Sequence, residues 1–514
     1  MTNDHSTIQP QARAAREPSG AARVAHGVAL GGLALYCFFA PASIAAAWIA
    51  ISIATVGWIA RSIITRRTNL RRTPFDLPLW LFFAWTLLSC ALSAEPRVSL
   101  AKIPSALTLL FIYVVAAILR TRREAAALAC VMICGASVAT LWGMADVVRG
   151  RGVVVEEIAG GSPLRTEPGV VAGDCVWRVN GRRVSSVAEI DDAIKRAPTG
   201  QPVTLSLITR GEHVERAGAI ATDAWKSEPS PSGIRGTHGT HRFRASGWTR
   251  HYETFAETVQ IVAQLALGFA LAHIVRRDCR RRRTALFAAA FALLACGVAL
   301  TAMRTATVAL VCGAAFAAWR AGGASRRARL AIACVVLVVL ALGALAVWRT
   351  RDAGALSLRD PSARLRVEVA RVVLARVPLH PVFGHGMDAV HLHWHEWGFP
   401  GEDMLHAHST PLQLAFDRGI PALLFWLWLM LALWLTLARA EKIFRETPDA
   451  MSHGLLLGAT GALTGFCLSS LVNYNFGDAE VALMLWWLMG TIVRVAATTE
   501  MSRSVEADEP SISI

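Results

Sequence analysis

Residues 380–421 read HPVFGHGMDAVHLHWHEWGFPGEDMLHAHSTPLQLAFDRGIP, a polar stretch between hydrophobic runs. Seven of the fifteen histidines of the chain lie between His380 and His408. The flanking runs have the length of membrane spans, so we expect this stretch at the mouth of a helical bundle. Titratable groups in such a place usually serve a function. We therefore take this stretch as the centre of the candidate site.

The composition indicates a membrane protein. Hydrophobic residues make up 54% of the 514 residues and charged residues only 17%, whereas soluble proteins carry about 25% charged residues. The mean hydropathy is +0.42. The net charge of +15 could indicate a nucleic-acid partner, but the arginines gather in short linkers between apolar runs. Membrane topology explains that pattern, so we predict no nucleic-acid binding.

The apolar runs predict an all-α polytopic membrane protein with about twelve transmembrane helices, interrupted by a small β-rich insert. Each run is close to the length of about 20 residues that a helix needs to cross the bilayer. The expected spans are residues 24–40, 42–64, 77–92, 103–119, 125–148, 255–275, 284–300, 305–319, 330–348, 420–437, 455–472 and 481–493.

Arginine-rich linkers follow every even-numbered span before the histidine stretch, for example Arg66–Arg67 and Arg280–Arg283. Positive charge in short linkers favours the cytoplasm, so both termini are expected there and the long loops on the other side. The predicted divisions are a cytoplasmic tail (1–23), spans 1–5 (24–148), a periplasmic insert (149–216), a periplasmic linker (217–254), spans 6–9 (255–348), a periplasmic catalytic loop (349–419), spans 10–12 (420–497) and a second cytoplasmic tail (498–514).

The insert resembles a PDZ domain. Its sequence GRGVVVEEIAGGSPLRTEPGVVAGDCVWRVNGRRVSSVAEIDDAIKRAPTGQPVTLSLITRG alternates valine with polar residues and carries turn signals such as Asn180–Gly181. The resemblance implies a peptide or protein partner that adds a strand to the sheet, with its carboxylate held by backbone N–H groups. The corresponding loop consists of Gly150, Arg151, Gly152 and Val153. The simpler interpretation is a spacer that packs on the bundle.

Four segments are expected to meet on the periplasmic side of the bundle. They are RASG (244–247) before span 6, Arg304 at the start of span 8, DPSAR (360–364) at the start of a helix, and His406 with His408 before span 10. Arginine at the edge of an apolar span is costly unless it reaches the interface or is paired. A surface helix and a structural histidine are the plainer interpretations of the last two segments.

These motifs, together with PVFGHG (381–386), AHSTPLQLAFDRGIPALL (407–424) and NFGDAE (475–480), resemble the O-antigen ligase and polymerase superfamily of bacterial envelopes. The resemblance covers nearly the whole chain outside the insert, although Ser409 stands where the family has Asn. It implies an inner-membrane glycosyltransferase of helical GT-C-type architecture. The implied donor is a polysaccharide on undecaprenyl pyrophosphate, the implied acceptor is lipid A-core or another glycan, and no cofactor is implied.

The residue types suit that chemistry. A pyrophosphate leaving group is anionic, and arginine binds it through paired hydrogen bonds. An acceptor hydroxyl needs a base near neutral pH, for which histidine is the usual choice. By motif position we predict His408 as the base, with His406 as the second choice, and Arg244, Arg304 and Arg364 as the pyrophosphate-binding residues. Direct displacement would invert the anomeric centre.

Other functions remain open at this point. The superfamily resemblance equally admits an O-antigen or exopolysaccharide polymerase, or a protein O-oligosaccharyltransferase. A PDZ-bearing membrane scaffold without catalysis is an alternative from another class. A divalent metal site built on His391, His393 and His395 with Glu396, Glu402 or Asp403 is a rival interpretation of the loop; we predict no metal.

Overall fold

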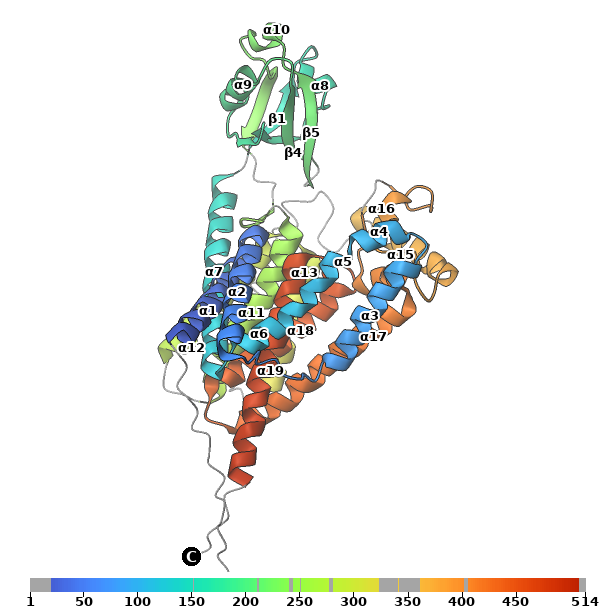
Figure 1. Ribbon diagram of the computed structural model, residues 1–514. Coiled ribbons are helices and arrows are strands. Elements are labelled where there is room, and N and C mark those ends of the chain that lie inside the picture. The colour runs from blue at the N-terminus through green and yellow to red at the C-terminus, as the bar shows by residue number, and fades with distance from the viewer. Residues whose placement is uncertain are drawn as a thin grey trace, which may run out of the picture.

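The computed structural model describes residues 20–150, 152–209, 212–239, 244–249, 251–276, 281–322, 341, 361–401 and 405–507. They form a helical bundle with a β-rich insert at one end (Figure 1). The helices before the insert are α1 (Gly20–Phe39), α2 (Ile44–Thr65), α3 (Asp76–Leu92), α4 (Pro96–Ala101), α5 (Ile103–Ala106), η1 (Leu107–Leu110), α6 (Phe111–Ile118) and α7 (Arg122–Arg149). Those after it are α11 (Tyr252–Val275), α12 (Arg281–Leu300), α13 (Arg304–Ala321), α15 (Pro361–Arg376), η2 (Val377–Leu379), α16 (Ala389–Leu392), α17 (Thr410–Glu446), α18 (Ala450–Ser470) and α19 (Ala479–Ala507).

Eight helices in the described part of the chain are long and apolar enough to cross a membrane, in agreement with a polytopic membrane protein. They are α1, α2, α7, α11, α12, α17, α18 and residues 479–497 of α19. Helix α3 and residues 103–118 are shorter apolar helices, and α13 covers the predicted span at 305–319. The predicted span at 330–348 lies outside the described residues except for Ala341. The count of twelve spans therefore stays a prediction.

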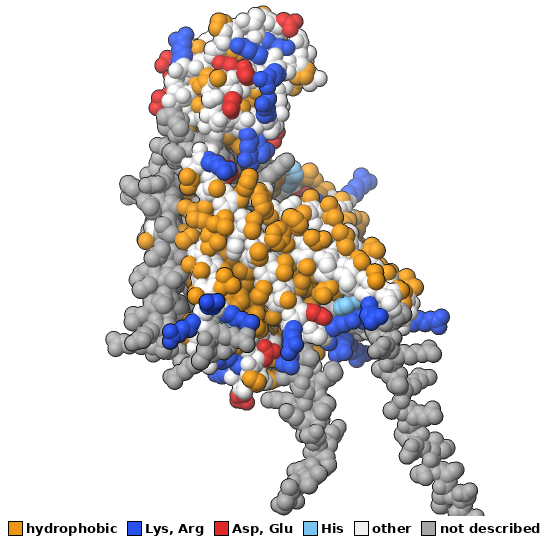
Figure 2. Space-filling view, turned by 90° about the vertical axis from the view of Figure 1, so that its left-hand side faces the viewer, with side chains coloured by type: hydrophobic (Ala, Val, Ile, Leu, Met, Phe, Trp, Pro, Cys, Tyr) orange, Lys and Arg blue, Asp and Glu red, His pale blue; other side chains and the backbone are white. Residues whose placement is uncertain are grey.

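The outer surface of the bundle fits a bilayer. Figure 2 shows a broad band of hydrophobic side chains below the insert, with Lys and Arg side chains gathered beneath that band. Helix α1 begins and α19 ends at the end of the bundle opposite the insert (Figure 1). The arginine linkers after α2 and before α7 and α12 belong to that same end, because the helices run in alternating directions.

Helix α11 is the centre of the bundle. Every residue from Thr254 to His273 is buried, and α11 packs against α12, α13 and α18. Glycines let α18 approach closely: a Cβ on Gly268 of α11 would lie 2.2 Å from the backbone N of Gly458 and 2.3 Å from the carbonyl O of Gly454. Small residues at helix contacts are how membrane helices pack without a hydrophobic driving force between them.

The insert is a six-stranded sheet with the order β5-β4-β2-β1-β6, in which β3 pairs with β2. All pairings are antiparallel. Its elements are β1 (Val153–Ile158), α8 (Pro163–Thr166), β2 (Cys175–Val179), β3 (Arg182–Arg183), α9 (Val187–Lys195), β4 (Pro202–Thr209), β5 (Glu212–Ile220), α10 (Asp223–Lys226) and β6 (Ile234–Gly239).

The insert is longer than the sequence predicts. Strand β6 pairs with β1, with His238 opposite Val154 and Gly236 opposite Glu157. The predicted boundary at residue 216 cuts through β5, and residues 217–220 and 234–239 of the predicted linker (217–254) belong to the sheet. This correction arises because β6 finds its partner some eighty residues earlier in the chain, a pairing that no local pattern reveals.

The close approach of α11 and α18 gives a first prediction. Gly268→Ala places a methyl group against the backbone of α18, so we expect a loss of about 1–3 kcal/mol in unfolding free energy. Thermal unfolding in detergent measures this. The matched control is Gly31→Ala in α1, where the new methyl group meets no atom within 4 Å. Equal melting midpoints for the two variants would contradict this account of the packing.

Candidate functional site

The segment that carries the two predicted histidines is a tight turn leading into α17. The rings of His406 and His408 meet edge to face with centroids 4.4 Å apart. His408 has a φ of 49°, which lies in the left-handed region that few non-glycine residues adopt. Ser409 is the N-cap of α17, since its Oγ accepts a hydrogen bond from the Leu412 N–H at 3.5 Å.

His408 has the environment of a neutral imidazole. Its Nε2 is buried, and no described residue forms a hydrogen bond with that atom. Burial, followed by the charges of His406 and Arg366, lowers the pKa of His408 to about 3. The ring is therefore unprotonated at neutral pH, and Nε2 is free to accept a proton.

A hydrogen-bonded clamp holds this turn against the bundle. The N–H and Oγ1 of Thr410 both donate to the carbonyl of Asn473, at 3.1 Å each. The same hydroxyl lies 3.1 Å from Oδ1 of Asn475, which also accepts from Ser470 Oγ at 2.8 Å. The loop between α18 and α19 thus fixes the first residue of α17, two positions after His408.

The clamp is anchored in the membrane bundle by Glu257 of α11. Asn473 Nδ2 donates to Glu257 Oε1 at 3.2 Å and lies 2.9 Å from Thr305 Oγ1 in α13. Ser469 Oγ also donates to that carboxyl oxygen. Three membrane helices therefore meet at one buried polar cluster directly behind the histidine turn, at the start of α13 where Arg304 lies.

Two arginines from other segments lie at the first turn of α11. Arg244 is buried, and its guanidinium carbon lies 4.2 Å above the ring of Tyr252 at the start of α11. Arg366 of α15 forms an ion pair with the neighbouring Glu253 at 3.6 Å, and its charge acts on His408. Arg244 and Arg366 thus lie at the first turn of α11, and the charge of Arg366 reaches His408.

The other two predicted arginines have different positions. Arg304 is half-buried at the first residue of α13, and the backbone N–H of Ala245 donates to Leu300 just before it, which ties Arg304 to the Arg244 segment. Arg364 is exposed. Residues two apart on a helix point in different directions, so Arg364 and Arg366 cannot both face the site. Of the two, only Arg366 has a charge that acts on His408, so the role predicted for Arg364 stays a prediction.

The remaining histidines of the loop hold it together. His385 stacks on Phe416 with ring centroids 4.3 Å apart, and its Nε2 lies 3.1 Å from the carbonyl O of Arg376. His393 lies between two carboxylates, 2.7 Å from Glu396 and 3.0 Å from Glu95; these hydrogen bonds raise its pKa.

The described residues show no metal cluster. Among them, no three His, Cys, Asp or Glu side chains are placed to share an ion. Glu402 and Asp403 of the rival metal interpretation lie outside the described residues.

Sequence reasoning did not identify the residues that line a cavity of ≈ 370 Å³ beneath the histidine turn. Arg418, just before the kink at Gly419 (φ 81°), lines it and donates to Thr86 Oγ1 of α3 at 3.3 Å. Tyr474 lines it as well, and its ring centroid lies 5.7 Å from that of His406. Both residues fall inside or next to quoted motifs, AFDRGIP and NFGDAE, but only the fold shows that they meet.

The predicted peptide-binding loop of the insert has little room for an added strand. Val153 begins β1, which is paired with β2 on one side and β6 on the other. A Cβ on Gly152 would lie 2.3 Å from the carbonyl of Val176, so the backbone is already packed there. Gly150 caps α7, and Arg151 lies outside the described residues. Strand addition at this loop is wrong as predicted, because both edges of β1 are occupied.

Comparison with known proteins found two similarities. Residues 289–427 match the model of the O-antigen ligase family. That stretch contains Arg304, Arg366, His406 and His408, and it ends before α18; Arg244 lies outside it. A probable periplasmic serine endoprotease DegP-like of Marinomonas sp. (strain MWYL1) is 38% identical over 61 residues. This similarity covers 12% of the present chain and 13% of that protein, so the chain spans only a small part of its length.

The clamp at Thr410 gives a second prediction. Thr410→Val keeps the shape of the side chain but removes its hydroxyl contacts with Asn473, Asn475 and Phe476, so we expect unfolding free energy to fall by about 1–2 kcal/mol. Thermal unfolding in detergent measures the change. Thr464→Val is the control, because the hydroxyl of Thr464 bonds only to Thr460 O within α18. If both variants lose the same stability, residues 473–475 do not act as a clamp.

Proposed function

We propose that this chain is a bacterial inner-membrane glycosyltransferase that moves a polysaccharide of the O-antigen kind from undecaprenyl pyrophosphate to lipid A-core. The match of residues 289–427 to the O-antigen ligase family supports a membrane enzyme of the glycan ligase or polymerase type. The single observation that carries the finer proposal is the unprotonated imidazole of His408, with a buried and unoccupied Nε2, beside arginines from other segments.

In this proposal Arg244, Arg304 and Arg366 hold the pyrophosphate of the donor. Their guanidinium groups come from three different segments, so a dianionic group between them would be bound from several sides. Negative charge grows on the leaving oxygen as the glycosidic bond breaks, and fixed positive charge at that position lowers the barrier. Arg418 lines the cavity of ≈ 370 Å³ beneath the histidine turn, and there it could bind the phosphate that carries the prenyl chain.

His408 acts as the general base. The acceptor hydroxyl gives its proton to His408 Nε2 while its oxygen attacks the anomeric carbon. The bond from that carbon to the phosphate oxygen breaks, and undecaprenyl pyrophosphate leaves with the electron pair. The reaction inverts the anomeric centre and uses no nucleotide sugar, metal or other cofactor.

Donor binding would raise the pKa of the proposed base, His408. In the free protein burial, followed by the positive charges of His406 and Arg366, keeps the pKa of His408 near 3, which leaves the ring neutral but weakly basic. An anionic diphosphate next to Arg366 would offset that positive charge and raise the pKa of His408 toward the working pH, where a general base is most effective. The base thus becomes strong only when the donor is in place.

The arginine linkers support the orientation that this chemistry needs. Positive charge at the end of the bundle where α1 begins and α19 ends favours the cytoplasm for that end. The histidine turn and the insert then face the periplasm, where lipid-linked glycans would meet their acceptor. For the insert we propose a peptide or protein partner.

The direct test is reconstitution of the purified full chain with a lipid-linked glycan and lipid A-core. We expect His408→Ala to lower the transfer rate by about 10²–10⁴-fold, the usual contribution of a general base. His395→Ala, at an exposed histidine of the same loop, is the control and should keep the wild-type rate. Normal transfer by a well-folded His408→Ala protein would rule out this base.

Glycan analysis of a deletion strain separates the related activities. A ligase defect leaves long chains on the lipid carrier, whereas a polymerase defect leaves single repeats. Loss of glycoprotein would identify a protein O-oligosaccharyltransferase instead. Wild-type glycans in the deletion strain would favour the non-catalytic scaffold.

The pH profile tests the electrostatics. Because Arg366 lowers the pKa of His408, Arg366→Gln should move the acid limb of kcat/KM to higher pH. The same variant should lose about 10²–10³-fold in rate through weaker charge stabilisation. Arg364→Gln, on the exposed face of α15, should change neither property. A larger effect from Arg364→Gln than from Arg366→Gln would reverse our assignment of the two arginines.

A further inference from the structure

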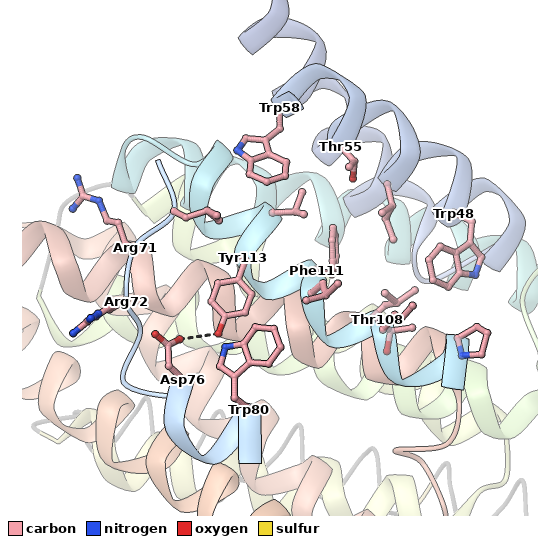
Figure 3. Close-up of a pocket in the computed structure, with 17 residues that line it drawn as sticks. Trp48, Thr55, Trp58, Arg71, Arg72, Asp76, Trp80, Thr108, Phe111 and Tyr113 are labelled. Atoms are coloured by element: carbon pink, nitrogen blue, oxygen red, sulfur yellow. Dashed lines mark hydrogen bonds between the residues drawn. The ribbon is translucent and has the colours of Figure 1, made fainter. Parts of the chain in front are cut away.

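A second cavity in the described part of the protein lies away from the histidine turn. It has a volume of ≈ 720 Å³ and is formed by α2, α3 and residues 104–114 (Figure 3). Its walls are mostly aromatic and aliphatic: Trp48 and Trp58 come from α2, Trp80 from α3, and Phe111 and Tyr113 from α6. Exposed hydrophobic side chains of α2 and α3 border it, so the cavity faces the lipid side of the bundle.

Two arginines lie at one end of this cavity. Arg71 and Arg72 belong to the linker between α2 and α3, and Figure 3 shows them at the edge of the pocket, with their guanidinium groups directed away from the aromatic side chains. This is the end of the bundle that carries the other arginine linkers. Hence the cavity is apolar along its length and positively charged at the level of the lipid headgroups.

The linker is held in place by side chains of the cavity itself. Trp58 Nε1 donates to the carbonyl of Thr68 at 2.9 Å. Asp76 accepts from the Thr73 N–H at 2.9 Å, from Thr73 Oγ1 at 2.6 Å and from Tyr113 OH at 2.8 Å. The carboxylate of Asp76 is thus fully engaged, and the fixed backbone presents Arg71 and Arg72 together at the cavity mouth.

We propose that this cavity binds one anionic glycerophospholipid from the bilayer. The acyl chains lie against the tryptophans, and the phosphate lies between Arg71 and Arg72. Arginine pairs bind phosphate oxygens through charge-assisted hydrogen bonds, and clusters of basic side chains at a membrane surface select anionic lipids. Arg71 and Arg72 lie at the other end of the bundle from Arg244, Arg304 and Arg366, although this cavity shares Trp48, Pro104 and Thr108 with the cavity that Arg418 lines.

Native mass spectrometry of the full chain tests this proposal. The protein is released from mixed micelles containing equal amounts of phosphatidylglycerol and phosphatidylcholine. We expect the wild type to retain one phosphatidylglycerol in preference to phosphatidylcholine. The variant R71Q/R72Q should bind phosphatidylglycerol about thirtyfold more weakly, since each arginine near the surface contributes to anionic lipid binding.

Two further variants make the result specific. R281Q/R282Q removes two exposed arginines from the same end of the bundle but away from the cavity, and should bind as the wild type does. Thr55→Trp fills the cavity and should abolish retention while leaving both arginines in place. If the Thr55→Trp protein does not elute as a single species in gel filtration, the variant Val114→Phe is used in its place. Val114→Phe is a smaller change in the same cavity.

Three outcomes would overturn the proposal. If R281Q/R282Q and R71Q/R72Q lose the same amount of phosphatidylglycerol binding, the lipid is attracted to the basic surface in general and not to this cavity. Undiminished retention in the cavity-filling variant would place the lipid elsewhere. Equal retention of the two lipids by the wild type would remove the role of the arginines.

Discussion

The hydrogen bonds between Thr410 and the loop at residues 473–475 are the constraint on which the candidate site depends. Thr410 follows His408 by two residues and is the first residue of α17, so fixing it fixes the direction in which the histidine turn leaves the bundle. Asn473 passes the constraint to Glu257 in the buried centre of α11. A polar turn at the end of an apolar bundle would otherwise have few contacts to define its shape. Here a buried polar cluster supplies them, as hydrogen bonds must where water is excluded.

The same first turn of α11 organises the charges. Tyr252 supports the guanidinium of Arg244 and Glu253 pairs with Arg366, so one helix end positions arginines from two distant segments. Burial, followed by the charges of His406 and Arg366, lowers the pKa of His408 and keeps it unprotonated. An anion is the ligand that such an arrangement lacks. The cavity lined by Arg71 and Arg72 resembles this site in one respect. There too, two arginines are held in fixed positions, here by a linker next to apolar walls, and we propose an anionic ligand for them.

Local sequence patterns predicted the parts of the fold that local physics determines. The apolar run at 255–275 became α11 (Tyr252–Val275), and the turn signal at Asn180–Gly181 became a turn with positive φ at both residues. Patterns could not reveal β6, because its partner β1 is distant in the chain. They could not separate Arg364 from Arg366 either, since packing alone decides which side of α15 faces the site. Asn473 and Asn475 were missed as clamp residues because their importance comes from Thr410, more than sixty residues away.

A structure of the full chain in a lipid nanodisc with undecaprenyl diphosphate would test the central claim most directly, namely that guanidinium groups from separate segments and the His408 imidazole share one anion site. Our account predicts density for the diphosphate within hydrogen-bond reach of Arg244, Arg304 and Arg366, with the prenyl chain leaving toward the cavity lined by Arg418 and Tyr474. Diphosphate density outside this cluster, with His408 turned away from it, would contradict the account.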